Sequence, residues 1–458
     1  MMRSALEIAH GVRHGMLSAV AVTEQCLAAI EERAGPLVAV TRVLSERARE
    51  EARRVDAMVA RGEDPGPLAG VPYGVKDLFD VAGLATSAGS AIFDDAPVAG
   101  HDAEAVERLR AAGGVLVATL NMDEFAYGFA TINARHGTTR NPHDPSRLAG
   151  GSSGGSAAVV AAGLMPFSLG SDTNGSVRVP ASLCGLYGLK PTHGALPLEG
   201  VFPFAESFDD VGPFTGSIAD MVLLWEVLTG GPASAAPPSF KVARLGGRFR
   251  DNADPAQLAA MDSIAGALGS AAAPLVIPDI GRARSAAFVI TAYEGGRLHR
   301  ETLARAAMAY DPQVRDRLLA GALLPEAIYE EALAFRALYK TQVLDLIADH
   351  DVLLAPATPC TAPSVADPRI EIDGAMSAAR ADLGIHTQAI TFLGLPSLAV
   401  PLRRPGQLPL GLQLIGRPGC EGTLFAFAKR LEDEGFIGVT VPEAFPAGAL
   451  AGNRGIDA

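Results

Sequence analysis

The chain has 458 residues, of which 48% are hydrophobic. This composition supports a large buried core, so it excludes a disordered or fibrous protein. The formal net charge of −13 disfavours nucleic acid as a direct ligand, because the phosphate backbone is also negative.

The N-terminal segment, residues 1–65, carries patterns typical of helices. One such pattern follows Thr23 and a second, highly charged one follows Ser45, and both residue types are common at helix starts. The first residues contain no apolar stretch followed by a small-residue cleavage site, and no window has the roughly 18 apolar residues of a membrane span. We therefore expect a cytoplasmic protein.

Strand and helix patterns alternate in the next part of the chain. Residues 71–76 and 114–120 are short and apolar, as in buried strands, and residues 103–112 between them have a helical pattern. Such alternation predicts an α/β fold. The four cysteines include no pair with zinc-site or disulfide-framework spacing, so no metal site is expected.

The remaining elements follow the same rules. Residues 141–155 are polar and glycine-rich and predict a loop, whereas the small apolar residues 156–164 predict a closely packed helix. A long helix is predicted at residues 325–348, where Pro325 stands at the start and apolar residues keep helical spacing. Residues 352–356 and 395–401 resemble strands.

Residues 230–238, rich in glycine, alanine and proline, admit two interpretations. They are either a linker between domains or a surface loop within one domain. Strand and helix patterns resume directly after them, so we favour the loop and a single domain over residues 1–458.

Two Gly/Ser clusters dominate the middle of the sequence, GGSSGGS at residues 150–156 and SDTNGS at residues 171–176. Alone, the first cluster fits a flexible loop, a phosphate cradle or a nucleophile elbow. The cradle lacks the following Gly-Lys-Ser/Thr of a P-loop, and the elbow lacks a preceding strand. Glycine-rich backbone can direct N–H groups at a developing oxyanion, and a serine hydroxyl can act as a nucleophile beside a base.

The longer pattern is specific. GGSSGGSAA, SDTNGS and GLKPT occur in this order, preceded by LAGVPYGVKDLFDVAG at residues 68–83 and followed by GLPSLAVP at residues 394–401 and PLGLQLIG at residues 409–416. This pattern resembles the amidase signature family over nearly the whole chain. The resemblance implies a mixed, twisted central sheet covered by helices on both faces, and an amidohydrolase without a metal or cofactor.

The resemblance also assigns roles to individual residues. Lys76 matches the family's catalytic lysine, Ser152 its bridging serine, which follows a cis peptide bond, and Ser176 its nucleophile. The implied oxyanion hole consists of four backbone N–H groups, those of Thr173, Asn174, Gly175 and Ser176.

A lysine can act as the base only when it is neutral, and its ordinary pKa is near 10.4. Activity near neutral pH therefore requires a pKa lowered by about 3 units, which burial in an apolar segment can supply. By itself, Lys76 beside Asp77 and Asp80 also fits the charged end of a strand; the serine clusters favour the catalytic interpretation.

Asn174 stands where many family members have glycine. Since asparagine tolerates left-handed backbone angles, we expect an intact oxyanion hole. The variant, together with residues 249–253 and 287–296, resembles the subfamily that hydrolyses 1-carboxybiuret in cyanuric acid catabolism. That subfamily implies a small urea-like substrate, ammonia release and an oligomer that includes a small helical partner protein. The glutaminase-type A chain of a tRNA-dependent amidotransferase shares the signature and remains the alternative.

Other polar residues near the clusters have competing interpretations. His136, His143 and His193 leave a Ser-His-Asp triad open. Arg178 either binds a substrate carboxylate or, as we favour, pairs with an internal acid such as Asp172.

Overall fold

The computed structural model describes residues 3–269 and 272–442. Its strands are β1 (Val40–Val43), β2 (Pro72–Lys76), β3 (Val115–Leu120), β4 (Ile132–Asn133), β5 (Gly137–Thr138), β6 (Arg140–Asn141), β7 (Asp144–Leu148), β8 (Phe167–Asp172), β9 (Tyr187–Lys190), β10 (Asp210–Thr215), β11 (Val242–Arg244), β12 (Val352–Pro356), β13 (Arg369–Ile372), β14 (Ala375–Ala378), β15 (Ser397–Pro401) and β16 (Gly411–Ile415). Its helices are α1 (Ala5–Arg13), α2 (Ala19–Arg33), α3 (Ser45–Ala60), α4 (Glu104–Ala111), α5 (Gly154–Ala161), α6 (Arg178–Cys184), α7 (Ile218–Thr229), α8 (Arg248–Asp251), α9 (Pro255–Ala267), α10 (Ile280–Ala306), α11 (Pro312–Ala322), α12 (Glu326–Leu346), α13 (Ala379–Asp382), α14 (Gln388–Leu393) and α15 (Glu421–Asp433).

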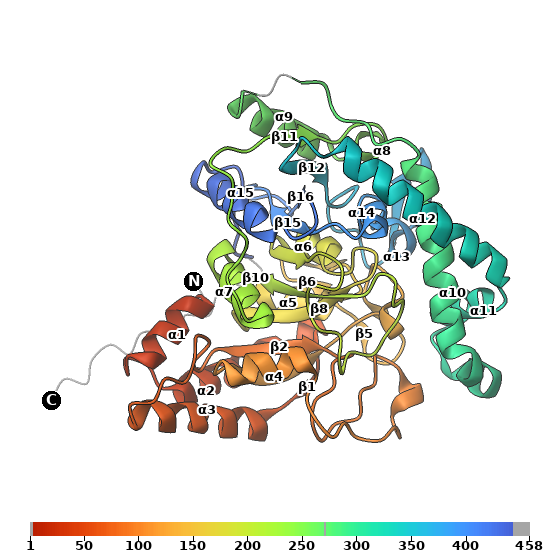
Figure 1. Cartoon of the computed structure of the whole chain (residues 1–458). Helices are drawn as coiled ribbons and strands as arrows, with labels where there is room; N and C mark the ends of the chain where they lie inside the picture. The colour runs from red at the N-terminus through yellow and green to blue at the C-terminus, as the bar shows by residue number, and fades with distance from the viewer. Residues whose placement is uncertain (1–2, 270–271, 443–458) are drawn as a thin grey trace.

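Ten of the strands form one mixed sheet in the order β1-β3-β2-β8-β10-β9-β15-β16-β12-β11 (Figure 1). Strand β2 runs parallel to both β3 and β8, whereas β10 is antiparallel to β8 and β9. Helices cover both faces of this sheet, which confirms the α/β fold expected from the resemblance. None of the described helices combines the length and apolar character needed to cross a membrane.

The exposed and half-exposed loop at residues 230–238 joins two parts of this sheet. All strands from β1 to β10 precede the loop, and β11 to β16 follow it, yet β9 pairs directly with β15. Hydrogen bonds of one sheet therefore join the parts of the chain before and after this segment, which also fits a linker in the sequence.

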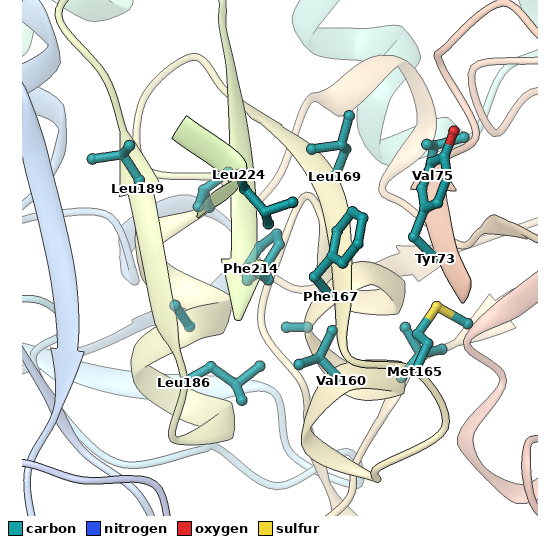
Figure 2. Close-up of a cluster of buried hydrophobic side chains, with 14 of the residues drawn as sticks. Tyr73, Val75, Val160, Met165, Phe167, Leu169, Leu186, Leu189, Phe214 and Leu224 are labelled. Carbon is teal, nitrogen blue, oxygen red and sulfur yellow. The ribbon is translucent and has the colours of Figure 1, made fainter. Parts of the chain in front are cut away.

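Large apolar side chains from adjacent strands fill the centre of the molecule (Figure 2). The rings of Tyr73 on β2 and Phe167 on β8 stack with their centroids 5.2 Å apart. Val160 of α5, Phe214 of β10 and Leu224 of α7 extend the same buried cluster. This core packs along β2 and β8 and holds the two strands in a defined position relative to each other.

Several predicted elements have shifted or different bounds. The predicted helix after Thr23 is α2, and it begins earlier, after the N-cap Ser18, whose hydroxyl accepts the Ala21 N–H. The segment 1–65 contains a strand, β1, in addition to its helices. The predicted loop 141–155 contains the β6–β7 hairpin, so the loop prediction was wrong for part of this segment.

The predicted helix at residues 325–348 is α12, which lies beside the long helix α10 at one side of the molecule (Figure 1). Of its regularly spaced apolar residues, Ala332, Tyr339 and Val343 are buried, whereas Ile328 and Leu346 near the ends are exposed. The helical pattern therefore predicted the buried stripe in the middle of α12, but this stripe is shorter than the spacing of apolar residues indicated.

Candidate active site

The site lies where two parallel strands end together. Strand β2 ends at Lys76, and β8 ends at Asp172. Because these strands are parallel neighbours, their carboxyl ends meet at the same edge of the sheet. The loop after β8, residues 173–177, and the turn before α5 also lie at this edge, since Ser153 N–H donates to the Ser176 carbonyl at 3.2 Å.

Lys76 is fully buried, and its ammonium or amine group contacts two serine hydroxyls. Its Nζ lies 2.7 Å from Ser152 Oγ and 2.8 Å from Ser171 Oγ. Burial lowers the pKa of Lys76 to about 7, and the nearby carboxylates of Asp123, Asp209 and Asp172 only partly oppose this shift. A large share of Lys76 is therefore neutral at neutral pH.

Those carboxylates have other partners. Asp172 accepts two hydrogen bonds from the Arg178 guanidinium, and Asp123 accepts backbone N–H groups of residues 130–132. Asp209 accepts the Thr173 hydroxyl at 2.6 Å, and burial raises its pKa to about 6. Within the described chain, none of the three bonds to Lys76 Nζ. The lysine thus lacks the direct ion pair that would hold its proton.

Ser176 lies close to this pair without completing the chain of hydrogen bonds. Ser176 is almost fully buried, and its Oγ takes part in no hydrogen bond with a described residue. The structure therefore contains the Lys76–Ser152 link but no Ser152–Ser176 link. The Gly151–Ser152 peptide bond is cis, as the resemblance implies. Gly151 is packed closely, since a Cβ there would lie 2.4 Å from Asp123 Oδ2.

The four backbone N–H groups expected to form an oxyanion hole differ in availability. Those of Thr173, Asn174 and Ser176 have no acceptor among the described residues, whereas the Gly175 N–H donates to Asp172 Oδ1 at 2.6 Å. The inclusion of Gly175 among the free donors therefore disagrees with the structure. Its N–H is occupied because Asp172 caps the start of the following turn.

Backbone conformation also differs from expectation within this loop. Gly175, not Asn174, has the positive φ, at 135°. A Cβ on Gly175 would lie 2.0 Å from the Thr387 hydroxyl, so glycine is required there. The tolerance of asparagine for left-handed backbone angles thus does not explain why asparagine stands at position 174. The Asn174 side chain instead donates to Thr291 Oγ1 at 3.0 Å.

Arg178 has the internal role that the sequence favoured. Its side chain is fully buried and forms a two-point contact with Asp172, with distances of 3.0 and 2.9 Å. Its remaining donors bond to Thr387, Thr391 and Gln413. Since every donor group of the guanidinium has a protein acceptor, Arg178 anchors the loop rather than binding a substrate.

Two of the three histidines near the serine clusters bond elsewhere through their rings, and the third, His136, has a buried Nε2 without a partner among the described residues. His143 Nε2 lies 3.1 Å from the Cys184 carbonyl, and His193 Nδ1 lies 3.1 Å from Asp210 Oδ1. Neither these residues nor His136 forms a hydrogen bond with Ser152 or Ser176 within the described part of the chain. A Ser-His-Asp arrangement at these serines is therefore absent from this part of the molecule.

A cavity of about 330 Å³ opens beside the cluster. Ser171 and Thr173 at the end of β8 line it, together with Phe204 and Asp209. The cavity is the right size for a small substrate, and it begins next to the hydroxyl that contacts Lys76.

Two residues near this cavity were missed in the sequence. Arg317 Nη1 and Arg380 Nη2 both donate to the Tyr127 carbonyl, at 3.3 and 3.4 Å. The Arg317 guanidinium also lies 3.6 Å from the Tyr127 ring centroid, and that ring packs against Phe204. Burial and the neighbouring Arg380 lower the pKa of Arg317. Neither arginine belongs to a local motif, so only the fold brings them together.

Ser171 was also missed as a contact of Lys76, although it begins the SDTNGS cluster. A signal existed, since Ser171 directly follows the short stretch FSLG at residues 167–170, in which large apolar and small residues alternate. Its role depends on the parallel pairing of β2 with β8, which the sequence does not specify.

Comparison with known proteins identifies close relatives of the whole chain. Residues 21–425 match the family described as Amidase. The chain is 46% identical to AtzE of Pseudomonas sp. (strain ADP), which is named as one subunit of 1-carboxybiuret hydrolase, over 94% of this chain and 98% of that protein. It is 35% identical to a glutamyl-tRNA(Gln) amidotransferase subunit of Carboxydothermus hydrogenoformans, over 94% of this chain and 96% of that protein.

Solved structures agree with these sequence matches. One, described as a vestigial protein complex that reveals the evolutionary origins of an s-triazine catabolic enzyme, superposes with a TM-score of 0.90 and 45% identity. The superposition covers 96% of this chain and 100% of the other.

Proposed function

We propose that this chain, which belongs to the Amidase family, hydrolyses an amide C–N bond of a small ureide with Ser176 as nucleophile and Lys76 as base. The amide-hydrolysing activity follows from family membership. The substrate class and the roles of individual residues are the proposal.

The contact of Lys76 with two hydroxyls carries the proposal. A buried lysine that touches serines at 2.7 and 2.8 Å and no carboxylate is poised to lose its proton near pH 7. A neutral amine has two N–H groups and one lone pair. When it donates one N–H to Ser171 Oγ, its lone pair can accept the Ser152 hydroxyl proton.

The proposed reaction proceeds by a proton relay. Ser176 Oγ attacks the amide carbonyl carbon while its proton moves to Ser152 Oγ, and the Ser152 proton moves to Lys76 Nζ. The C–N bond then breaks as the proton returns to the leaving nitrogen, which leaves as ammonia and yields an ester on Ser176. Water attacks this ester through the same relay. The relay requires Ser176 Oγ to approach Ser152 Oγ within hydrogen-bond distance, the one link that the structure does not contain.

Backbone amides support the negative charge that develops on the carbonyl oxygen. The N–H groups of Thr173, Asn174 and Ser176 have no acceptor in the described chain, so they are free to bind an oxyanion. We assign Gly175 a different role. Its N–H bonds to Asp172, which in turn binds Arg178, and this anchoring fixes the orientation of the three free donors.

The relatives support a urea-like substrate. The protein with 46% identity is named for the hydrolysis of 1-carboxybiuret, a compound with amide groups and a carboxylate. The Arg317 and Arg380 guanidinium groups both donate to the Tyr127 carbonyl, and the Tyr127 ring packs against Phe204 of the cavity wall. Arg317 has no salt bridge with a described residue. A substrate carboxylate at this position would gain charge-assisted hydrogen bonds.

The same relatives support an assembly with a partner protein. The 46% identical protein is named as one subunit of its enzyme, and the similar solved structure is described as a protein complex. We propose that this chain also assembles with a partner protein. The alternative activity, glutamine hydrolysis for a tRNA-dependent amidotransferase, is supported by relatives of lower identity.

An ammonia-release screen tests the proposal. We expect purified protein to release ammonia from 1-carboxybiuret or biuret faster than from glutamine or simple aryl amides. Faster release from glutamine, dependent on added partner proteins, would favour the alternative. Activity that survives in Ser176→Ala would show that the nucleophile is wrong.

A further inference from the structure

We propose that the side chain of Asn174 is a substrate-specificity element, whose Oδ1 accepts a hydrogen bond from the N–H beside the scissile carbonyl of a ureide. This inference rests on the proposed function and adds a side-chain contact to it. It concerns the carboxamide of Asn174, not its backbone N–H.

The Asn174 side chain is held at one end only. Its Nδ2 donates to Thr291 Oγ1 on helix α10 at 3.0 Å. Its Oδ1 is buried and accepts no hydrogen bond from any described residue. The residue as a whole is 7% exposed. The anchored Nδ2 fixes the direction of a carbonyl oxygen that has no donor within the described chain.

The backbone of Asn174 is fixed as well. Its carbonyl accepts the Thr387 hydroxyl at 2.7 Å, and Gly175 directly after it donates to Asp172. The main chain of this loop therefore has little freedom, and the side chain cannot satisfy its Oδ1 by a simple shift of the loop.

An unsatisfied buried acceptor costs about 1–3 kcal/mol, and a ligand that donates to it recovers this cost. Asn174 is two residues before Ser176, in the loop whose free N–H groups surround the proposed oxyanion position. The partner that reaches this acceptor is thus a group adjacent to the carbonyl under attack.

The chemistry of an amide oxygen selects the ligand class. Oδ1 is an acceptor only, so it matches a donor and disfavours both a methylene and a carboxylate oxygen. Ureides carry an N–H between two carbonyls, whereas ordinary dicarboxylic amides carry a CH₂ there. A site built to bind an N–H discriminates against the analogue without it, because the buried acceptor then stays unpaired.

Biuret and malonamide provide a matched pair of probes, since they differ only by the central N–H and CH₂. We would measure kcat/KM for both with the wild-type chain and with Asn174→Ala, which retains Cβ and suits the φ of this position. The expected result is a fall of about 10–100-fold in the biuret-to-malonamide ratio. An equal loss for both substrates would overturn the inference, because it would mean that the side chain only positions the loop.

Thr291→Val is the second variant, because it removes the acceptor of Asn174 Nδ2 and keeps the side-chain shape. The same ratio should fall by a smaller factor, about 2–10-fold, as Oδ1 loses its fixed direction. An unchanged ratio would contradict the anchoring role of α10. Labelling of Ser176 by a fluorophosphonate in both variants verifies that each is folded.

Failure of the proposed function gives a different result. If the wild-type chain hydrolyses neither probe nor 1-carboxybiuret, ureide hydrolysis is wrong, and calorimetric binding of the probes to Ser176→Ala still tests the inference. Tighter binding of biuret than malonamide, lost in Ser176→Ala/Asn174→Ala, supports the contact with Oδ1. Equal affinity for the two probes refutes it.

Discussion

Two lysines buried in the same sheet have opposite surroundings. Lys76 ends β2 and contacts the hydroxyls of Ser152 and Ser171, whereas Lys190 ends β9 and donates to Asp210 Oδ2 at 2.6 Å and to the Pro191 carbonyl. Both side chains are fully buried. Burial alone therefore does not distinguish them; their partners do.

This difference shows how a single fold assigns two functions to one residue type. A buried lysine that donates to a carboxylate forms an ion pair, whose attraction offsets part of the desolvation cost of both groups. A lysine among hydroxyls has no such compensation, and the pKa of Lys76 falls to about 7. The first arrangement is structural, and the second prepares a base.

The largest expected effect comes from removing the proposed relay next to Lys76. Ser176→Ala and Ser152→Ala should each lower kcat by about 10³–10⁶-fold, since members of a catalytic unit act together. The rates need not separate the two roles. A fluorophosphonate should label wild type at Ser176, label Ser152→Ala slowly and leave Ser176→Ala unlabelled.

Mass spectrometry of the labelled peptide decides this assignment, and a label on Ser152 or Ser153 in wild type would refute it. Ser153 neighbours Ser152 in the sequence but lies outside the proposed relay, so Ser153→Ala serves as a control that should lose much less activity. Ser153 Oγ, however, bonds to the backbone N–H and carbonyl of Ser171 at 3.3 and 3.1 Å. Its variant therefore requires a stability measurement as well.

Exchanging the two lysines for methionine sharpens the comparison directly. Lys76→Met should abolish measurable turnover and cost only about 1–2 kcal/mol of unfolding free energy, the value of its hydroxyl contacts. Lys190→Met should cost about 3–5 kcal/mol, because the buried Asp210 carboxylate loses its lysine partner and keeps, among the described residues, only His193 Nδ1 and the Gly194 N–H. Denaturant unfolding and kcat measured on both variants would test this, and equal destabilisation would remove the distinction.

The pH dependence of activity should reflect the protonation of Lys76. The base must be neutral, and Lys76 gains its proton as pH falls through about 7. We therefore expect kcat/KM to decline about 50-fold between pH 7 and pH 5, with a slope that approaches about tenfold per pH unit well below the pKa. A stopped assay from pH 5 to 9 measures this decline on the acidic side of the profile. A profile that stays flat to pH 5 would exclude a lysine base with this pKa.

The smallest expected effect concerns the second hydroxyl on Lys76. Ser171→Ala removes the acceptor that orients the amine, so kcat should fall by about tenfold while Ser152 remains in place. Ser168→Ala is the matched control on the same strand, because its hydroxyl donates to the Ser156 carbonyl and does not contact Lys76. If Ser168→Ala and Ser171→Ala lose activity equally, Ser171 acts only through packing.

Local sequence determined much of this protein. Apolar segments bounded by glycine and proline predicted β2, β3 and β12 closely, because a buried strand needs little beyond its own apolar side chains. The serine and lysine motifs identified the residues that meet at the edge of the sheet. The internal pairing of Arg178 with Asp172 was also predictable, because both lie in one short segment.

Tertiary structure decided what depends on residues distant in sequence. Ser171 contacts Lys76 only because β2 and β8 are parallel neighbours, and Gly175 must be glycine only because Thr387 lies against it. The β6–β7 hairpin has too little apolar character to be recognised locally. Lys76 and Lys190 are similar in sequence, each at the end of an apolar strand, and only the fold places hydroxyls beside one and a carboxylate beside the other. Since a pKa depends on the distances to all neighbouring groups, no local pattern could distinguish them.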